Sequence, residues 1–232
     1  AEHWKGIGCR FQSLYSGFLG SAGQIGLVEQ IFDWFREENT LVMVDPVMGD
    51  GGKLYKTYTP EMASGMARLC GRADIVVPNM TEAHHLLERE YDPGPYTRQQ
   101  IEGILKGLCA LGPRMAVLTG VWLKEGSLGT ACYDAATGEA ELYLTDRIEG
   151  FYHGTGDLFA SALLGGLLNG MSLNAACETA TEFTWRTIET THEKCADHRF
   201  GPKFECHLPW LGEKWKRVEK LLQILRIYGK MS

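Results

Sequence analysis

The sequence predicts an α/β fold, with three layers (α/β/α) around a mostly parallel central sheet. Short apolar runs at residues 40–46, 75–77 and 115–121 are typical of buried strands, and helical patterns lie between them. Strands that alternate with helices form a parallel sheet covered on both faces. Ligands of such sheets bind beyond the carboxyl ends of the strands. The residues that end each apolar run are therefore the first candidates for a functional site.

The helices are predicted from apolar spacing. In residues 21–39, Ile25, Val28 and Phe32 fall three or four positions apart, and Ser21 is a plausible N-cap. The same spacing predicts helices over residues 81–91 and 97–112, and two more within 156–169 and 172–191. We also expect a hairpin over residues 129–145 that turns at Thr137 and Gly138.

Composition narrows the function class. The 232 residues are 44% apolar, enough for a substantial core in a single domain. A net charge of −6 argues against a nucleic-acid surface, and we expect no nucleic-acid partner. No apolar run approaches the roughly 20 residues of a membrane span, and we expect no membrane partner. The seven cysteines are scattered and never form CxxC, which favours reduced thiols and a cytoplasmic location.

Two carboxylates follow the first apolar run, in the stretch DPVMGDGGKLY. Asp45 and Asp50 stand five residues apart in a glycine-rich loop, where they could converge on a hard cation. Mg²⁺ typically binds one or two carboxylates and keeps several waters and substrate phosphates. The alternative is an ordinary turn, in which Gly49, Gly51 and Gly52 supply positive φ. Spacing alone leaves both interpretations open.

The stretch PNMTE ends the second run. Asn79 could hold a ligand hydroxyl, a phosphate or a metal-bound water, and Glu82 could orient metal-bound waters. The alternative is helix-end chemistry: Asn79 or Thr81 caps the helix, and Glu82 suits the positive end of its dipole. Taken alone, this stretch favours the helix end.

The stretch HGTGDLFA opens an apolar helix. Gly154, Thr155 and Gly156 leave backbone N–H groups at the helix start, where an anion such as a phosphoryl group is stabilised. Asp157 in the first turn could accept a proton from a substrate hydroxyl beside that anion. The alternative is a glycine turn with an Asp that suits the dipole. GxxxxGK[ST] and the third glycine of a dinucleotide fingerprint are both absent, which disfavours P-loop NTPases and simple NAD enzymes.

In this order, the stretches DPVMGDGGKLY, ADIVVPNMTEAHHLL, VLTGV and HGTGDLFASALLGGLL resemble the pyridoxal/pyridoxamine kinases of the ribokinase-like superfamily. YSGFLGS also fits a strand-to-helix turn of that family. The resemblance covers about residues 4 to 208. GTGD in place of GAGD points to the vitamin kinases, and the loop after DPVM favours pyridoxal kinases over hydroxymethylpyrimidine kinases.

The resemblance implies ATP-dependent phosphorylation of the 5′-hydroxymethyl group of a B6 vitamer. It also implies Mg²⁺, a monovalent cation as a further cofactor, and a homodimer in the full-length protein. The implied roles are a general base at Asp157, an anion hole at Gly154, Thr155 and Gly156, Mg²⁺ and its waters at Asp45, Asp50 and Glu82, the ATP side at Asn79, Thr119 and Gly120, and contact with the bound ligands near Tyr55.

The resemblance also divides the chain. Residues 1–208 correspond to the kinase domain without the family's opening strand and vitamer-binding loop, so we expect weak Mg·ATP binding and poor transfer. Residues 209–232 form a basic tail in which Trp215, Val218, Leu222 and Leu225 share a helical face. A docked terminal helix is the favoured interpretation, with a partner or membrane surface as the alternative.

Two alternative functions stay open. One is a hydroxymethylpyrimidine (phosphate) kinase, and the other is a non-catalytic nucleotide-binding remnant. A separate cluster, His192, Cys195 and His198 with Cys206 and His207, contains possible Zn²⁺ ligand types. Its spacing matches no zinc-finger pattern, and we interpret it as chance helical spacing.

Overall fold

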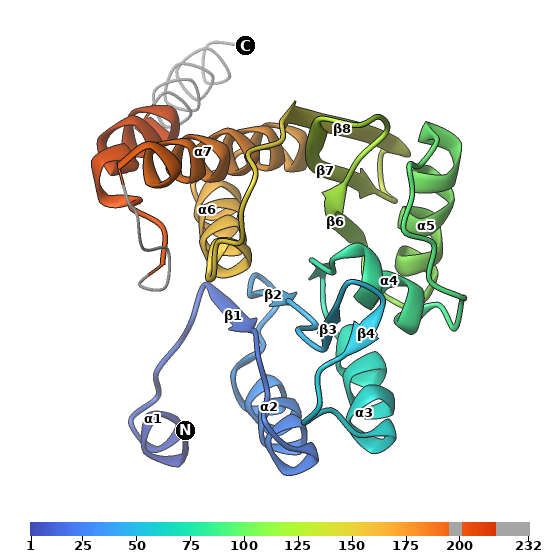
Figure 1. Ribbon diagram of the computed structural model, residues 1–232. Coiled ribbons are helices and arrows are strands. Elements are labelled where there is room, and N and C mark those ends of the chain that lie inside the picture. The colour runs from blue at the N-terminus through green and yellow to red at the C-terminus, as the bar shows by residue number, and fades with distance from the viewer. Residues whose placement is uncertain (195–200, 217–232) are drawn as a thin grey trace. The chain divides into compact units, whose positions relative to one another are not determined.

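The computed structural model describes residues 1–194 and 201–216. The chain forms two compact units, Ala1–Leu142 and Tyr143–Ser232. The ribbon of both units is shown in Figure 1. Within the described ranges, none of the helices is long and apolar enough to cross a membrane.

The principal sheet has the strand order β1-β2-β5-β6-β7-β8 in the part of the chain that the structure describes. β1, β2, β5 and β6 run parallel, and β7 is antiparallel to β6. A mostly parallel sheet with helices between its strands confirms the predicted fold class. The strands are β1 (Ser13–Ser16), β2 (Leu41–Val44), β5 (Ile75–Val76), β6 (Met115–Val121), β7 (Ser127–Asp134) and β8 (Glu139–Asp146).

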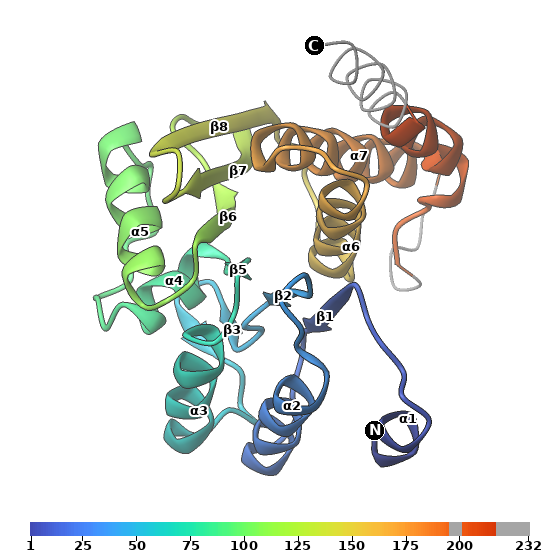
Figure 2. The same cartoon turned by 180° about the vertical axis from the view of Figure 1, so that it is seen from behind.

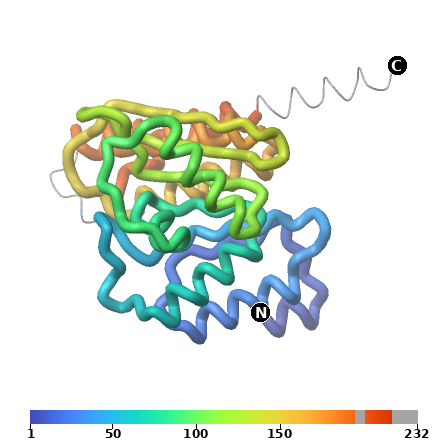
Figure 3. Tube along the Cα trace, turned by 90° about the vertical axis from the view of Figure 1, so that its right-hand side faces the viewer, coloured from blue at the N-terminus to red at the C-terminus, as the bar shows by residue number. Residues whose placement is uncertain are grey.

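Four helices of the first unit, α2 to α5, begin at polar caps. Ser21 accepts a hydrogen bond from the Gln24 N–H at 3.3 Å, which confirms the predicted start of α2. Thr59 and Thr97 cap α3 and α5 in the same way. In Figures 1 and 3, α2 and α3 lie side by side. The helices are α1 (Glu2–Gly6), α2 (Ala22–Phe35), α3 (Pro60–Cys70), α4 (Met80–Leu86) and α5 (Arg98–Ala110).

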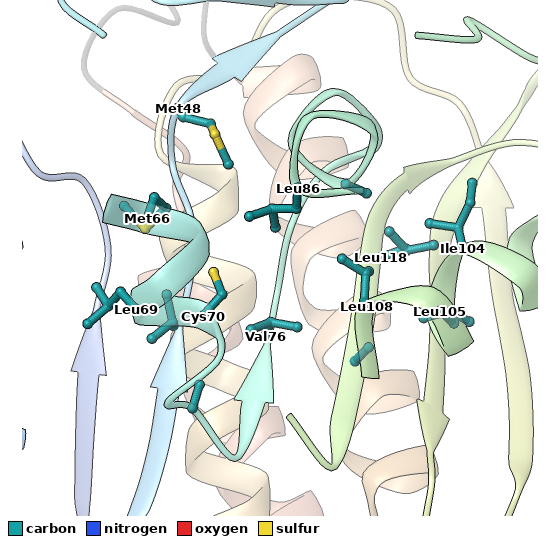
Figure 4. Close-up of a cluster of buried hydrophobic side chains, with 14 of the residues drawn as sticks. Met48, Met66, Leu69, Cys70, Val76, Leu86, Ile104, Leu105, Leu108 and Leu118 are labelled. Atoms are coloured by element: carbon teal, nitrogen blue, oxygen red, sulfur yellow. The ribbon is translucent and has the colours of Figure 1, made fainter. Parts of the chain in front are cut away.

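The core of the first unit joins α2, α3, α4 and α5 to one face of the sheet. Val76 and Leu118 project from β5 and β6 into a cluster with side chains of α3, α4 and α5 (Figure 4). Burial of each such side chain stabilises the fold by about 1.5–3 kcal/mol. The neighbouring strand residues Ile75 and Val117 are also fully buried. The strands are therefore continuous apolar runs rather than alternating ones, as parallel strands buried on both faces require.

The second unit is helical after β8. α6 (Thr155–Leu168) and α7 (Leu173–Lys194) pack against each other, and a Cβ added at Gly166 would lie 3.1 Å from the Cβ of Ala176 (Figure 2). A 3₁₀ turn, η2 (Glu205–His207), leads into helical residues 208–216. The Trp215 ring lies against Gly165 of α6. The described part of the tail thus packs on its own unit, while Val218, Leu222 and Leu225 lie outside the described residues.

The structure corrects the predicted helix 81–91, which ends at Leu86. Glu88 adopts a left-handed conformation with φ of 53°. The Arg89 and Glu88 N–H groups donate to the His84 and His85 carbonyls at 2.8 and 3.1 Å. This is the Schellman arrangement that usually has glycine at the position of Glu88, and it stops the helix.

Other elements were not predicted. The sequence pattern indicated no helix at α3 and no strands within the glycine-rich loop, where β3 (Gly49–Asp50) and β4 (Lys53–Leu54) form an antiparallel hairpin. The predicted hairpin turn at Thr137 and Gly138 is confirmed between β7 and β8.

Candidate active site

Polar residues from three neighbouring strands meet at one edge of the sheet in the first unit. Asp45 directly follows β2, Asn79 follows β5, and Thr119 lies near the end of β6. Thr119 pairs with Asn79 in an isolated parallel bridge, and its N–H donates to the Pro78 carbonyl at 3.0 Å. Gly120 follows in a left-handed conformation, φ 71°, at a break in the β6–β7 register. Strand order and direction therefore bring these residues together, as the sequence predicted.

Asn79 and Glu82 form a capping box at the start of α4. The Asn79 side-chain oxygen accepts from the Glu82 N–H at 3.0 Å, and Glu82 Oε2 accepts from the Asn79 N–H at 2.8 Å. Two N–H groups that the first helical turn leaves unpaired are thereby satisfied. The helix-end interpretation of PNMTE is confirmed.

The same two side chains also hold the glycine-rich loop. Glu82 Oε1 accepts from the Met48 N–H at 3.1 Å, and Asn79 Nδ2 donates to the Gly49 carbonyl at 2.8 Å. Both carboxylate oxygens of Glu82 thus bind backbone N–H groups.

The glycines of this loop act differently from one another. Gly51 and Gly52 have positive φ, 57° and 79°, but Gly49 does not, so the predicted positive φ at Gly49 is wrong. Gly49 is required by close approach, because an added Cβ would lie 2.4 Å from the Lys53 carbonyl oxygen.

Burial and neighbouring negative charges raise the pKa values of Glu82 and Tyr55 at this edge of the sheet. Glu82 is only 3% exposed, and burial raises its pKa to about 8, assisted by the negative charge of Asp45. Hydrogen bonds from the Asn79 and Met48 N–H groups act in the opposite direction. Partial burial, followed by the charges of Glu82, Asp50 and Asp45, raises the pKa of Tyr55. The four side chains therefore share one electrostatic environment.

The two aspartates differ in accessibility. Asp45 is 7% exposed, and the Tyr15 hydroxyl donates to its Oδ2 at 3.5 Å. Asp50 is exposed, and its Oδ1 accepts from the Gly51 N–H at 2.7 Å. Tyr15 was not predicted, because its contact with Asp45 joins residues 30 positions apart.

The donor set fits Mg²⁺ bound chiefly through water and phosphate. In the described ranges, no three His, Cys, Asp or Glu side chains are arranged to hold a metal ion by themselves. Mg²⁺ commonly uses only one or two carboxylates and takes its other ligands from water and substrate phosphates. Asp45 and Asp50 could supply such ligands, whereas the oxygens of Glu82 already accept backbone hydrogen bonds.

In the second unit, α6 begins at a glycine and leaves backbone N–H groups at its start, as the sequence predicted. Gly154 is the N-cap in a left-handed conformation, φ 85°, and the first helical hydrogen bond runs from the Leu158 N–H to its carbonyl at 3.0 Å. The N–H groups of Thr155, Gly156 and Asp157 have no acceptor among the described residues. Such groups at a helix start, together with the dipole, favour an anion.

The side chains around this helix start leave it open. Asp157 is exposed in the first turn, and a Cβ added at Gly156 would meet no neighbouring atom within 4 Å. The Thr155 hydroxyl turns back to donate to the Tyr152 carbonyl at 3.1 Å. Packing within the protein therefore does not explain the glycine at 156, whereas space for a ligand would.

Contacts with α7 brace the segment before α6. The Tyr152 hydroxyl lies 3.0 Å from the Glu149 carbonyl and 2.8 Å from His192 Nδ1. The Thr190 hydroxyl forms a hydrogen bond with His207 Nε2 at 2.8 Å. The described histidines of the possible zinc cluster thus have other partners, and Cys195 and His198 lie outside the described residues.

Comparison with known sequences places the chain in a family. The profile of the phosphomethylpyrimidine kinase family matches residues 8–203. A pyridoxine/pyridoxal/pyridoxamine kinase of Bordetella avium is 29% identical over 189 residues, which cover 78% of this chain and 60% of the relative. The chain thus spans about 60% of the length of this curated relative.

Solved structures agree with the profile. Pyridoxal kinase from Lactobacillus plantarum is 28% identical with a TM-score of 0.77, over 96% of this chain and 76% of that one. A Bacteroides thetaiotaomicron protein assigned as a phosphomethylpyrimidine kinase, in a crystal form with pyridoxal, is 28% identical with a TM-score of 0.82, over 94% and 74% of the two chains. The chain belongs to the phosphomethylpyrimidine kinase family, and within the ribokinase-like superfamily its relatives are pyridoxal kinases.

Proposed function

We propose that this protein transfers the γ-phosphoryl group of ATP to the 5′-hydroxymethyl group of a B6 vitamer. The start of α6 is the observation that carries the proposal. It combines three N–H donors that lack acceptors among the described residues with an exposed carboxylate in the same helical turn. Phosphoryl transfer requires little else from a protein than positioned donors for the moving charge and a base for the attacking hydroxyl.

Asp157 is assigned as the general base. Its carboxylate would accept the proton of the substrate hydroxyl as that oxygen attacks phosphorus. The N–H groups of Thr155, Gly156 and Asp157 would stabilise the charge on the transferring phosphoryl oxygens. Gly154 sets the direction of these donors through its left-handed conformation.

Asp45 and Asp50 are assigned to Mg²⁺, which when bound neutralises charge on the ATP phosphates. Glu82 and Asn79 hold the loop that carries these acids, through the bonds to Met48 and Gly49. Thr119 and Gly120 are assigned to the ATP side, and Tyr55 to contact with the ligands. A monovalent cation requirement, homodimer formation and a cytoplasmic location stay predictions.

The family profile favours one second candidate, phosphorylation of a hydroxymethylpyrimidine. Both acceptors are primary alcohols on a six-membered aromatic ring, so the same groups would serve either reaction. The loop DPVMGDGGKLY, by its resemblance, supports the B6 vitamers.

The test measures ATP binding to this chain with and without Mg²⁺, and then ADP release in the presence of each acceptor. We expect weak but Mg²⁺-dependent ATP binding, and slow ADP release with pyridoxal, pyridoxamine or pyridoxine. Faster release with hydroxymethylpyrimidine would favour the second candidate. Equal ATP affinity with and without Mg²⁺ would contradict the roles of Asp45 and Asp50.

A further inference from the structure

The β3–β4 hairpin carries Asp50 at its end and is too short to hold its own shape. Each of its strands has two residues, and isolated hairpins even of ordinary length are marginal in water. Its conformation must therefore come from contacts with neighbouring elements. Glu82 and Asn79 fix its first side, at Met48 and Gly49.

The turn of the hairpin has two further contacts, which the proposed function does not use. The Gly52 N–H donates to Thr81 Oγ1 at 2.9 Å, and Thr81 is only 2% exposed in the first turn of α4. The Tyr91 ring also lies against Gly52, since a Cβ added there would be 2.5 Å from its Cδ1. Tyr91 in turn packs edge-on against the buried His84 of α4, with ring centroids 5.7 Å apart.

These contacts bear directly on the carboxylate. Gly51 lies between Asp50 and Gly52, and its N–H donates to Asp50 Oδ1 at 2.7 Å. A change in the turn at Gly52 therefore redirects the N–H that orients the Asp50 carboxylate. Asp50 has no described side-chain partner that could orient it in place of this bond.

The segment that carries Tyr91 is itself tied down. The Trp122 indole N–H donates to the Pro93 carbonyl at 3.0 Å, and the Tyr96 N–H donates to the Trp122 carbonyl at 3.0 Å. Tyr96 is 4% exposed. This segment is thus fixed to the end of β6 and can serve as a rigid support.

We propose that Thr81 and Tyr91 are positioning residues for Mg·ATP, which hold the Gly51–Gly52 turn through two separate contacts and thereby orient Asp50. Neither residue contacts the ligand in this proposal, and the inference rests on the proposed role of Asp50. Residues that orient metal ligands typically contribute 10- to 100-fold to metal affinity.

The test is the Mg²⁺ concentration that gives half-maximal ATP binding, measured for single variants of this chain. We expect Thr81→Val to raise this Mg²⁺ concentration about tenfold, because valine keeps the shape of threonine but cannot accept a hydrogen bond from the Gly52 N–H. Thr81→Ser should restore the original value. Tyr91→Leu should raise the midpoint, and Tyr91→Phe should not, because the described contact uses the ring.

Tyr133→Leu is the matched control for Tyr91→Leu, since Tyr133 is also a partly buried tyrosine packed on the same core. It should leave the midpoint unchanged. Asp50→Asn separates the two proposals. A midpoint that shifts with Asp50→Asn but not with Thr81→Val overturns the positioning role alone, and no shift with Asp50→Asn overturns both.

A second measurement does not depend on ligand. Hydrogen exchange at the Gly52 amide should be protected in the parent chain and in Thr81→Ser, and should become faster in Thr81→Val. Equal exchange in all three would overturn the Thr81 contact.

Discussion

The acidic sheet edge of the first unit and the start of α6 in the second unit are built in opposite ways. At the edge, Glu82 is 3% exposed and one of its hydrogen bonds comes from Met48, 34 positions away. At α6, the donors are backbone N–H groups and Asp157 is exposed. The edge depends on tertiary contacts, whereas the helix start depends on local backbone conformation. Substitutions at the edge should therefore affect stability first, and those at α6 should affect function first.

The largest effect is expected at Asp157. Asp157→Asn should lower the transfer rate by about 10²- to 10⁴-fold, because the amide cannot accept the substrate proton. ATP affinity and the thermal midpoint should change little, since the side chain is exposed. Single-turnover kinetics and ATP titration measure both. Near-parental turnover would remove Asp157 from the role of base.

The second-largest effect is expected at Glu82, on the free energy of unfolding. Glu82→Ala should destabilise the protein by about 2 to 5 kcal/mol, because the Met48 and Asn79 N–H groups would lose their acceptor. Urea unfolding without ligand measures this change. Glu82→Gln retains an acceptor oxygen and should cost less. A loss as small as that of an exposed acid would contradict the structural role.

Glu82 also predicts a pH dependence. Its pKa is raised from 4.5 to about 8 in the fold, so the folded state binds more protons between these values than the unfolded state. Its contribution to stability is therefore fully present below about pH 4.5 and is lost as the pH rises to about 8. Glu82→Gln should remove this component of the slope. Parallel stability curves for the two proteins would contradict the raised pKa.

The smallest effects overall are expected at two glycines of the α6 start, Gly154 and Gly156, which form a matched pair. Gly154→Ala should cost about 1–2 kcal/mol, because φ of 85° is strained for alanine. Gly156→Ala should change stability by less than about 1 kcal/mol, since the added Cβ meets no neighbouring atom and alanine favours a helix. Gly156→Ala should nevertheless weaken ATP binding by crowding the anion. Unchanged ATP affinity in Gly156→Ala would argue against an anion site there.

Several features could be predicted because short stretches of chain determine them. The cap of α2 at Ser21, the helix end at Asn79, and the glycine start of α6 each involve residues within four positions. The sequence also predicted that Asp45 and Asn79 lie at the same edge of the sheet, because the carboxyl ends of parallel strands meet there. The end of α4 was not predicted, because Glu88 adopts a left-handed conformation that glycine usually adopts at a helix end.

By itself the sequence determined the fold class, the strand ends that carry polar groups, and the conformation of the α6 start. These depend on apolar periodicity, capping and glycine backbone freedom, which act over a few residues. Only the tertiary structure decided that Tyr15 reaches Asp45, that Thr81 and Tyr91 hold the turn at Gly52, and that Glu82 is buried with a raised pKa. Those contacts join elements that are distant along the chain. Bringing distant segments together costs loop-closure entropy, which is offset only when the whole core forms. A local sequence pattern therefore does not predict these contacts.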